Sequence, residues 1–231
     1  MQSRRRFLEH CLRQRLALPR AEYTQAQLPT ACQQCQCRGA RGTTCWQQLD
    51  EQGYHAVTEQ LGGGTLQRHT HLAKAVGSLV QRWCLVQPLY EQRVLAWDRP
   101  STRRGEEHTV ERAILDLEYV GPEGRRWIDV TVRHPAAGDE SAVRAAARKD
   151  GSASRRAERQ KHQRYPGANL IPFAVETPGQ LGAEARAWLL GQVRNLPVED
   201  QTRELMRAYR VISCAVHGNV AQQLRRAAGL R

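Results

Sequence analysis

The segment Asp116–Val132, DLEYVGPEGRRWIDVTV, constrains the fold most because it combines two strand patterns with one turn. Apolar and polar residues alternate on both sides of a turn at Gly121–Gly124. This alternation predicts two adjacent strands, residues 113–120 and 126–132, that pair as a hairpin.

Each predicted strand carries an aspartate, Asp116 on the first and Asp129 on the second. Alternation assigns Ile128, Val130 and Val132 to one face of the second strand, which we expect to pack inward. Asp129 then opens on the opposite face. Two crowded carboxylates cost free energy unless a cation or hydrogen bonds compensate, so the hairpin itself raises the question of a binding site.

The remaining hydrophobic patterns predict an α/β domain with the order helix, three strands, helix, strand and then helices. The expected elements besides the hairpin are a helix at 69–83, a strand within 84–97, a helix at 141–164, a strand at 169–177, a helix at 183–196 and a C-terminal helix. The apolar stripe of the last helix consists of Leu205, Tyr209, Ile212, Val216, Val220 and Leu224.

These patterns divide the chain into three expected regions. Residues 1–67 form a basic, Cys/His-rich segment, residues 68–195 form the α/β core, and residues 196–231 form a helical tail. Cys84 and Cys214 lie in apolar sequence and are expected in the core.

Basic side chains outnumber acidic ones by 35 to 23, which gives a formal net charge of +12. Arginine dominates, since Lys74, Lys149 and Lys161 are the only lysines of the chain. Guanidinium groups suit planar contact with phosphate, so nucleic acid is the expected partner. A basic surface that only maintains solubility is the alternative.

Arginine runs and tryptophans extend this expectation. Arginines at 4–6, 103–104, 125–126 and 155–156 could contact phosphates on either side of a site. The tryptophans that could stack on bases, or pack in the core instead, are Trp46, Trp97 and Trp127.

The chain shows no export or membrane signal. No apolar run approaches the roughly 20 residues of a membrane helix, and the basic N-terminus lacks the apolar segment of a secretory signal. We therefore expect an intracellular protein, in the nucleus, without a membrane partner.

The two hairpin aspartates favour a divalent-cation site, because Mg²⁺ prefers oxygen ligands and commonly takes one or two carboxylates. On the following helix, Glu158, Lys161 and Tyr165 share a stripe with little apolar content. Lys161 could stabilise charge that develops on a phosphate. The alternative is that the aspartates are surface residues at strand ends and Lys161 is a solvated charge.

Four cysteines crowd into residues 32–45 and precede two histidines. Without an export signal, such clusters favour metal over disulfides, and thiolate and imidazole are the ligands of structural Zn²⁺. Six side chains are candidates for the roughly four ligand positions of a Zn²⁺ site: Cys32, Cys35, Cys37, Cys45, His55 and His69. We favour Cys35, Cys37, His55 and His69, and expect His71 to face solvent. Free thiols in a flexible segment are the alternative.

The segments LDLEYVGPEGRRWIDVTVRHP and AERQKHQRYPGANLIPFAVETPGQLGAEARAWL resemble the restriction-like endonuclease domain found after the reverse transcriptase in some non-LTR retroelements. That domain belongs to the PD-(D/E)XK nuclease superfamily. Its pattern is matched here by Asp116, Asp129 and the Lys161/Tyr165 pair, and Glu91 in LYEQRV matches an upstream acidic position. The cysteine–histidine segment resembles the family's finger, and AYRVISCAVHGNVAQQL resembles its closing helix.

This resemblance implies a restriction-endonuclease-like core that hydrolyses DNA with Mg²⁺ or Mn²⁺ and nicks the target of a retrotransposon, with DNA and the element's RNA as partners. Asp116 and Asp129 would hold the metal, and Lys161 would stabilise the transition state or position water. Tyr165 would support the lysine or the substrate, and Glu91 would be a weaker candidate for binding the metal or orienting water.

Three positions depart from the family pattern. The proline that usually precedes the first aspartate is missing, since AILD stands there instead. Thr131 stands where the superfamily's usual lysine is expected, so catalysis would depend on Lys161. Glu59 stands where the finger has a later cysteine. The departures at Thr131 and Glu59 favour the alternative function, a catalytically inactive nucleic-acid-binding module that retains the fold and the finger. A repair or resolvase-type nuclease that acts on branched DNA is a third reading.

Overall fold

The structure, a computed structural model, describes residues 54–58, 63–102, 109–135, 137 and 140–227. Its helices are α3 (Tyr54–Thr58), α4 (Gly64–Cys84), the 3₁₀ helix η2 (Leu95–Trp97), α5 (Glu140–Arg148), α6 (Ser152–Arg164), α7 (Ala183–Arg194) and α8 (Val198–Ala227). Its strands are β1 (Leu89–Arg93), β2 (Arg99–Pro100), β3 (Val110–Glu111), β4 (Ile114–Gly121), β5 (Gly124–Arg133) and β6 (Leu170–Glu176).

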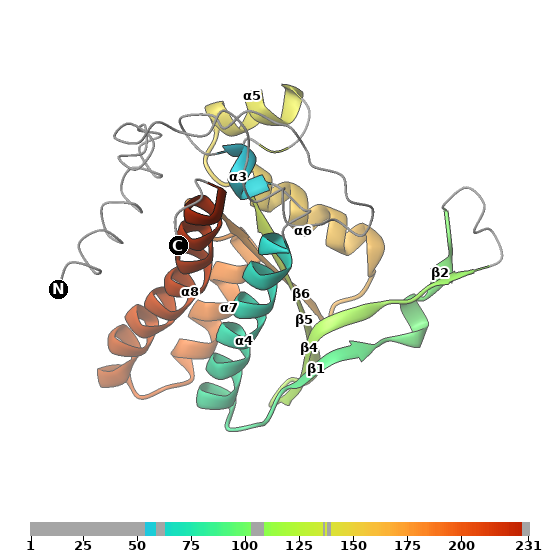
Figure 1. Ribbon diagram of the computed structural model, residues 1–231. Coiled ribbons are helices and arrows are strands. Elements are labelled where there is room, and N and C mark those ends of the chain that lie inside the picture. The colour runs from blue at the N-terminus through green and yellow to red at the C-terminus, as the bar shows by residue number, and fades with distance from the viewer. Residues whose placement is uncertain (1–53, 59–62, 103–108, 136, 138–139, 228–231) are drawn as a thin grey trace.

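A mixed four-stranded sheet with the order β1-β4-β5-β6 forms the centre of the fold. The strands β1, β4 and β5 are antiparallel, and β6 runs parallel to β5. A parallel neighbour requires a crossover connection, which here contains α5 and α6. The mixed α/β class predicted from the sequence is confirmed. The predicted element order differs in two places, since β2 and β3 were not expected and two helices, α5 and α6, replace one. The short β2–β3 pair projects away from α4, α7 and α8 (Figure 1).

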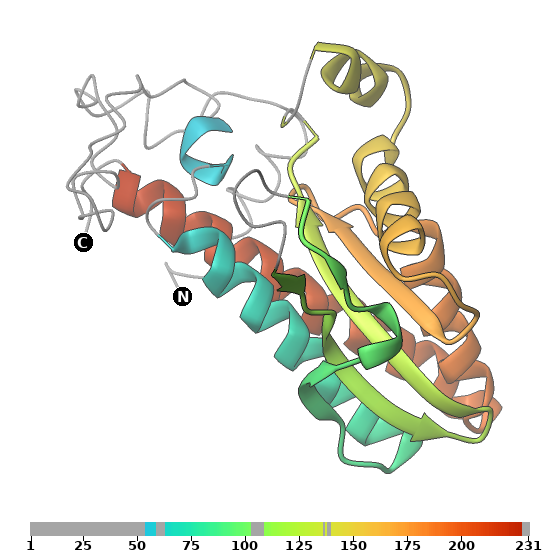
Figure 2. The ribbon, with the colours of Figure 1, turned by 90° about the vertical axis from the view of Figure 1, so that its right-hand side faces the viewer.

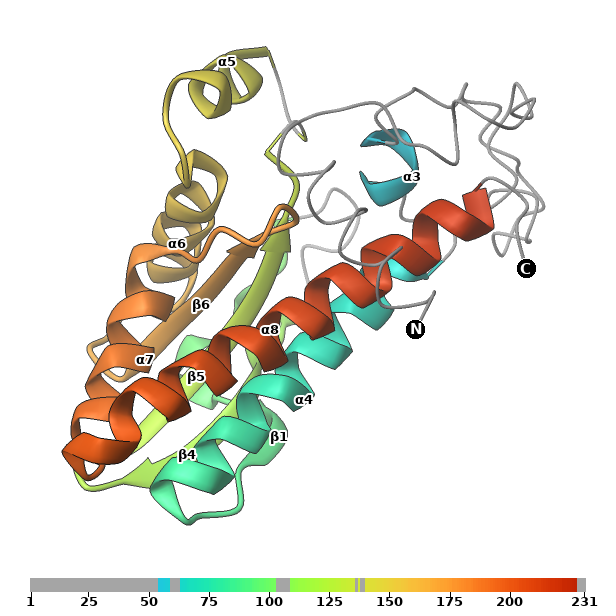
Figure 3. The same cartoon turned by 90° about the vertical axis from the view of Figure 1, so that its left-hand side faces the viewer.

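One face of the sheet carries the apolar core and is covered by α4, α7 and α8 (Figures 1 and 3). The buried strand residues on this face are Leu117, Tyr119, Ile128, Val130, Phe173 and Val175. Each fully buried Leu, Ile, Val or Phe side chain contributes roughly 1.5–3 kcal/mol. Gly77 of α4 lets the helix approach the sheet closely, since a Cβ there would collide with the Tyr90 hydroxyl. The burial of Ile128 and Val130 in this core confirms the inward face predicted for the second hairpin strand.

The opposite face of the sheet is covered by α6 only over β5 and β6 (Figure 2). Small residues of α6, Ala153 and Ala157, are buried there. Glu176 of β6 accepts a hydrogen bond from the Ser154 N–H at 2.9 Å and so caps the first turn of α6. The face over β1 and β4 has no helix on it among the described residues, so the polar side chains of β4 border an open edge.

Two carboxylates on α6 and β6 act at helix starts rather than in a site. Besides Glu176, Glu158 accepts the Glu184 N–H at 2.9 Å and caps α7. Gly182 precedes that helix, and a Cβ on it would collide with the Glu158 carboxylate. Glu158 therefore joins α6 to α7, although its spacing from Lys161 placed it with the candidate site residues.

The single helix expected at 141–164 is wrong. Helix α5 ends at Arg148 and α6 begins at Ser152. Gly151 between them has a φ of 71°, a left-handed conformation that glycine adopts without steric cost and that interrupts a right-handed helix. The break lets α6 pack on the sheet while α5 extends beyond the end of β5 (Figure 2).

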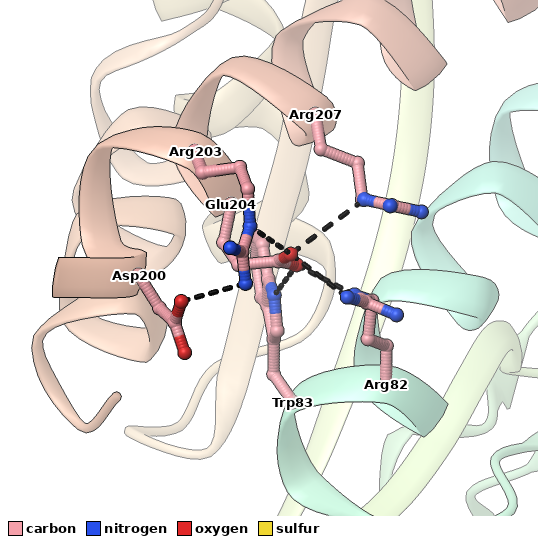
Figure 4. Close-up of polar contacts among 6 residues, drawn as sticks. All are labelled: Arg82, Trp83, Asp200, Arg203, Glu204 and Arg207. Atoms are coloured by element: carbon pink, nitrogen blue, oxygen red, sulfur yellow. Dashed lines mark hydrogen bonds and ion pairs between the residues drawn. The ribbon is translucent and has the colours of Figure 1, made fainter. Parts of the chain in front are cut away.

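Helix α8 lies along α4, and a carboxylate network joins the two helices (Figures 3 and 4). Glu204 of α8 is only 3% exposed and accepts hydrogen bonds from Arg82 Nε at 2.5 Å, Arg82 Nη2 at 2.8 Å and Trp83 Nε1 at 3.2 Å. Arg203 and Arg207 approach the same carboxylate at 3.8 Å and 3.6 Å. The hydrogen bond from Arg82 is the main reason that the pKa of Glu204 falls to about 2.

The predicted apolar stripe of α8 is confirmed, since Ile212, Val216, Val220 and Leu224 are buried. Cys214 is exposed, so its assignment to the core is wrong. It lies two residues from both Ile212 and Val216, which places it on the side of the helix opposite the stripe. None of the helices that the structure describes has both the length and the apolar character needed to cross a membrane.

Candidate acidic site

Asp116 and Asp129 lie opposite one another at the point where β4 and β5 separate. The ladder between these strands runs from Gly121↔Gly124 to Leu117↔Ile128 and ends there. One residue further along, the Asp116 carboxylate takes the place of a backbone acceptor, because its Oδ2 accepts the Val130 N–H at 2.7 Å. The aspartates thus come from neighbouring strands and meet at a gap in the sheet.

Lys161 reaches this gap from α6. Its Nζ lies 2.6 Å from Oδ2 of Asp129 as an ion pair. The Asp129 side chain is 6% exposed and that of Lys161 26% exposed, so the pair is shielded but remains accessible from the lysine side. Thr131, where the resemblance noted from the sequence led us to expect a lysine, lies on β5 opposite Ala174 of β6. The ammonium at the site therefore comes from the helix.

His69 of α4 is a fourth member of the cluster, and the sequence pattern assigned it to zinc instead. Its Nε2 lies 3.2 Å from Oδ2 of Asp116. The signal that could have placed it is the helical stripe of α4, because His69 precedes the buried Leu72 by three positions and Val76 by seven. Four elements, α4, β4, β5 and α6, thus each contribute one charged or titratable side chain.

The electrostatics of the cluster separate the two aspartates. Burial raises the pKa of Asp129 to about 7; the Lys161 charge opposes this rise, and the Asp116 carboxylate adds to it. Burial also acts on Asp116, but the hydrogen bond and charge of His69 outweigh it and hold the pKa of Asp116 below its ordinary value. The hydrogen bond to Asp116 in turn raises the pKa of His69.

The residues present fit a divalent cation in two respects. Oδ2 of Asp129 is buried and accepts no hydrogen bond of good geometry, since the Lys161 contact is an ion pair only. This oxygen is engaged by the Lys161 ammonium, and its carboxylate is of the type that a divalent cation binds. The described residues contain no group of three His, Cys, Asp or Glu side chains arranged around one metal position. Mg²⁺ does not need one, because it commonly binds one or two carboxylates and keeps water or phosphate ligands.

Tyr165 ends α6 beside this cluster. Its ring centroid lies 5.9 Å from Lys161 Nζ and 4.8 Å from the guanidinium carbon of Arg164. Burial and the negative charge of Asp129 raise the pKa of Tyr165. The ring therefore helps to fix the lysine through cation–π contact.

Trp97 packs beside Tyr165, and Trp127 packs against Trp97. The Trp97 ring lies 5.6 Å from that of Tyr165 and 5.2 Å from that of Trp127. Trp127 Nε1 donates to Glu118 at 3.3 Å. Both tryptophans are half-buried, so the rings form part of the wall next to the site. Trp46 lies outside the described residues.

Glu91 is the predicted site residue that the structure does not bring into contact with the cluster. It lies on β1 between Tyr90 and Gln92, whose partners Leu117 and Leu115 flank Asp116. Glu91 is exposed and has a φ of 53°, which is unusual for a residue other than glycine. In the part of the chain described here, no hydrogen bond or ion pair holds its side chain.

The predicted zinc ligands are separated or lie outside the described residues. Cys35 and Cys37, like Cys32 and Cys45, fall in the undescribed N-terminal region. His55 lies on α3, whereas His69 contacts Asp116. The zinc site remains a prediction, and the geometry gives His69 a different neighbour.

Two of the arginine runs that were expected to contact phosphate lie outside the described residues, and two lie within them. Arginines 4–6 and 103–104 lie outside the described residues. Arg125 forms an ion pair with Glu118 at 3.1 Å on the face that bears the aspartates. Arg126 pairs with Glu123 in the hairpin turn, and the 155–156 pair lies on α6.

Comparison of the chain with protein-family models, with curated proteins and with solved structures returned no match.

Proposed function

We propose that this chain is a metal-dependent endonuclease of the PD-(D/E)XK kind that hydrolyses DNA phosphodiester bonds. One observation carries the proposal: Asp116, Asp129 and Lys161, from two strands and a helix, converge where β4 and β5 separate. The element order around the sheet, with a helix before three antiparallel strands and a helix before a parallel fourth, agrees with that superfamily.

The roles follow from the positions of the side chains. Asp116 and Asp129 would hold Mg²⁺ or Mn²⁺, which when bound polarises a phosphate and lowers the pKa of water. Lys161 Nζ is placed to stabilise negative charge on the phosphate beside Asp129. His69 orients Asp116, and Tyr165 positions Lys161. Such a nick would supply the primer end in a retrotransposon, where the chain would act in the nucleus on DNA in the presence of element RNA.

The formal charge of +12 supports a polyanionic substrate, and the site is bordered by the open face of β1 and β4. Sequence-independent contacts to phosphate would then provide most of the affinity. In the N-terminal region, bound Zn²⁺ would be structural and would help to hold the nucleic acid.

A plasmid-nicking assay tests this proposal. The full chain is incubated with supercoiled plasmid and Mg²⁺ or Mn²⁺, with EDTA as a blank, and Asp129→Asn is compared with Glu123→Gln. Glu123 is a matched acidic control because its side chain is 78% exposed in the hairpin turn. We expect at least about a 100-fold loss of nicking for Asp129→Asn and none for Glu123→Gln.

Two outcomes contradict the enzymatic proposal: equal nicking by wild type and Asp129→Asn, or no nicking by wild type with either metal. In the second case, retained DNA binding would favour the non-catalytic binding module. Stronger cleavage of branched than of plain duplex DNA would favour the resolvase-type nuclease.

A further inference from the structure

A second basic site lies on the face of the sheet that bears Asp129. Arg133 is the last residue of β5, and side chains at even separations along a strand share a face. Four residues separate it from Asp129, a distance of about 13 Å at ~3.3 Å per residue. Arg133 therefore lies on the same face of β5 as Asp129, at the end of the strand that is farther from the acidic site.

Arg156 of α6 lies beside Arg133. Arg133 Nη2 donates to Gln160 Oε1 at 3.4 Å, and Gln160 is one helical turn beyond Arg156. Burial and the nearby charge of Arg156 both lower the pKa of Arg133, which is the response of a cation to another cation. The Arg156 Nη2 donates to the Ala137 carbonyl at 3.2 Å, which fixes its guanidinium near the end of β5.

No carboxylate among the described side chains forms an ion pair with either arginine. The nearest candidate by strand pairing is Glu176, the partner of Arg133 on β6. Its carboxylate is engaged instead by the Ser154 N–H at the start of α6. Two adjacent guanidinium groups without a counter-charge repel one another, and a bound anion would remove that repulsion.

We infer that Arg133 and Arg156 together bind a backbone phosphate of the nucleic-acid strand whose cleavage is proposed at Asp129. This inference rests on the proposed function and adds the direction in which the substrate extends: from the acidic site along β5 towards Arg133. Because the two sites are about 13 Å apart, a substrate that reaches both must be a nucleic-acid strand with more than one phosphate between its ends. A mononucleotide is too short to reach both sites.

The test measures binding without cleavage. A fluorescently labelled DNA duplex is titrated with the full chain in EDTA, by fluorescence anisotropy, across a series of salt concentrations. The double variant Arg133→Gln/Arg156→Gln is compared with Arg186→Gln/Arg194→Gln, which removes the same charge from exposed positions on α7, across the sheet. Loss of the one phosphate contact that both arginines share should reduce the slope of log K against log salt by about 0.9.

We expect that reduction for the Arg133/Arg156 variant, with an affinity loss at low salt of at least about tenfold, and an unchanged slope for the α7 variant. Arg133→Lys/Arg156→Lys, which keeps both charges, should restore most of the slope and so excludes misfolding as the cause. An unchanged slope for Arg133→Gln/Arg156→Gln, or an equal reduction for the α7 variant, overturns the inference.

This result is separable from nuclease activity. If the wild type binds DNA with the predicted salt dependence but never nicks it, the phosphate site stands while the proposed reaction fails. If nicking depends on Asp129 but the salt slope is unchanged when Arg133 and Arg156 are replaced, the proposed reaction is supported and the phosphate site is contradicted.

Discussion

The Nζ of Lys161 lies 2.6 Å from Oδ2 of Asp129, although the two residues come from a helix and a strand that α5 separates in the chain. This contact brings an ammonium group to the aspartates from α6. The strand itself supplies none, because Thr131 occupies the position at which a lysine was expected. The contact also explains how a helix-borne lysine can serve a pair of strand-borne carboxylates.

Lys161→Met should abolish most of the nicking while leaving DNA binding intact. Methionine fills a similar volume but removes the positive charge beside Asp129. Loss of a group that stabilises charge in the transition state costs about 100- to 1,000-fold in rate. Single-turnover nicking measures the effect, with Lys149→Met as the matched control, since Lys149 is exposed between α5 and α6. Nicking by Lys161→Met at the wild-type rate would remove the lysine from the reaction.

His69→Ala should lower nicking by about 10- to 100-fold, the range found when a side chain that orients a metal ligand is lost. The zinc content should not change, because the structure places the His69 imidazole 3.2 Å from Asp116. Elemental analysis of the purified protein measures the zinc, and His71→Ala, two residues away and exposed, is the control. A fall in zinc for His69→Ala alone would restore the assignment made from the sequence.

Glu158→Ala should destabilise the fold without slowing the reaction. Its carboxylate accepts the Glu184 N–H at the start of α7, and loss of such a cap costs about 1 kcal/mol. Thermal unfolding measures the change, with Gln163→Ala on the exposed side of α6 as the control. A strong loss of nicking per folded molecule would instead mean that Glu158 acts together with Lys161.

Glu204→Gln should destabilise the α4–α8 contact at neutral pH and change the response to acid. The wild-type carboxylate has its pKa lowered to about 2 by Arg82, so its contribution is full above the ordinary pKa of glutamate and disappears as the pH falls towards 2. Loss of charged hydrogen bonds costs about 1.5–3 kcal/mol.

Urea unfolding between neutral pH and pH 2 measures this linkage. The stability difference between wild type and Glu204→Gln should shrink as the pH falls through that window. Glu199→Gln, an exposed acid in the first turn of α8, should show no comparable loss. A difference that is independent of pH would contradict the assigned role of the Glu204 charge.

The strands and the two faces of the sheet were predictable because apolar and polar residues alternate along a half-buried strand with a period of two, which can be read directly from the sequence. Ile128 and Val130 face the core and Asp129 the opposite side, as that period requires. Asp116 and Asp129 were also accessible to prediction, since the turn fixes the hairpin register and hence which residues oppose each other.

Tertiary contacts decided the features that sequence reasoning missed. Gly151 breaks the helix at 141–164, but glycine alone does not reveal a left-handed φ. His69 has the spacing of a zinc ligand and also the spacing of a core-facing helix position, and only the packing of α4 against the sheet selects Asp116 as its neighbour. Glu158 shares a helix stripe with Lys161, yet its partner is the start of α7.

The most direct test of the central claim is a crystal of the protein grown with Mn²⁺ and examined by anomalous diffraction. The account predicts one Mn²⁺ peak within coordination distance of carboxylate oxygens from both Asp116 and Asp129, and its loss in Asp116→Asn/Asp129→Asn crystals. A Mn²⁺ peak that persists in that variant, or saturating Mn²⁺ without any peak between the two carboxylates, would contradict it.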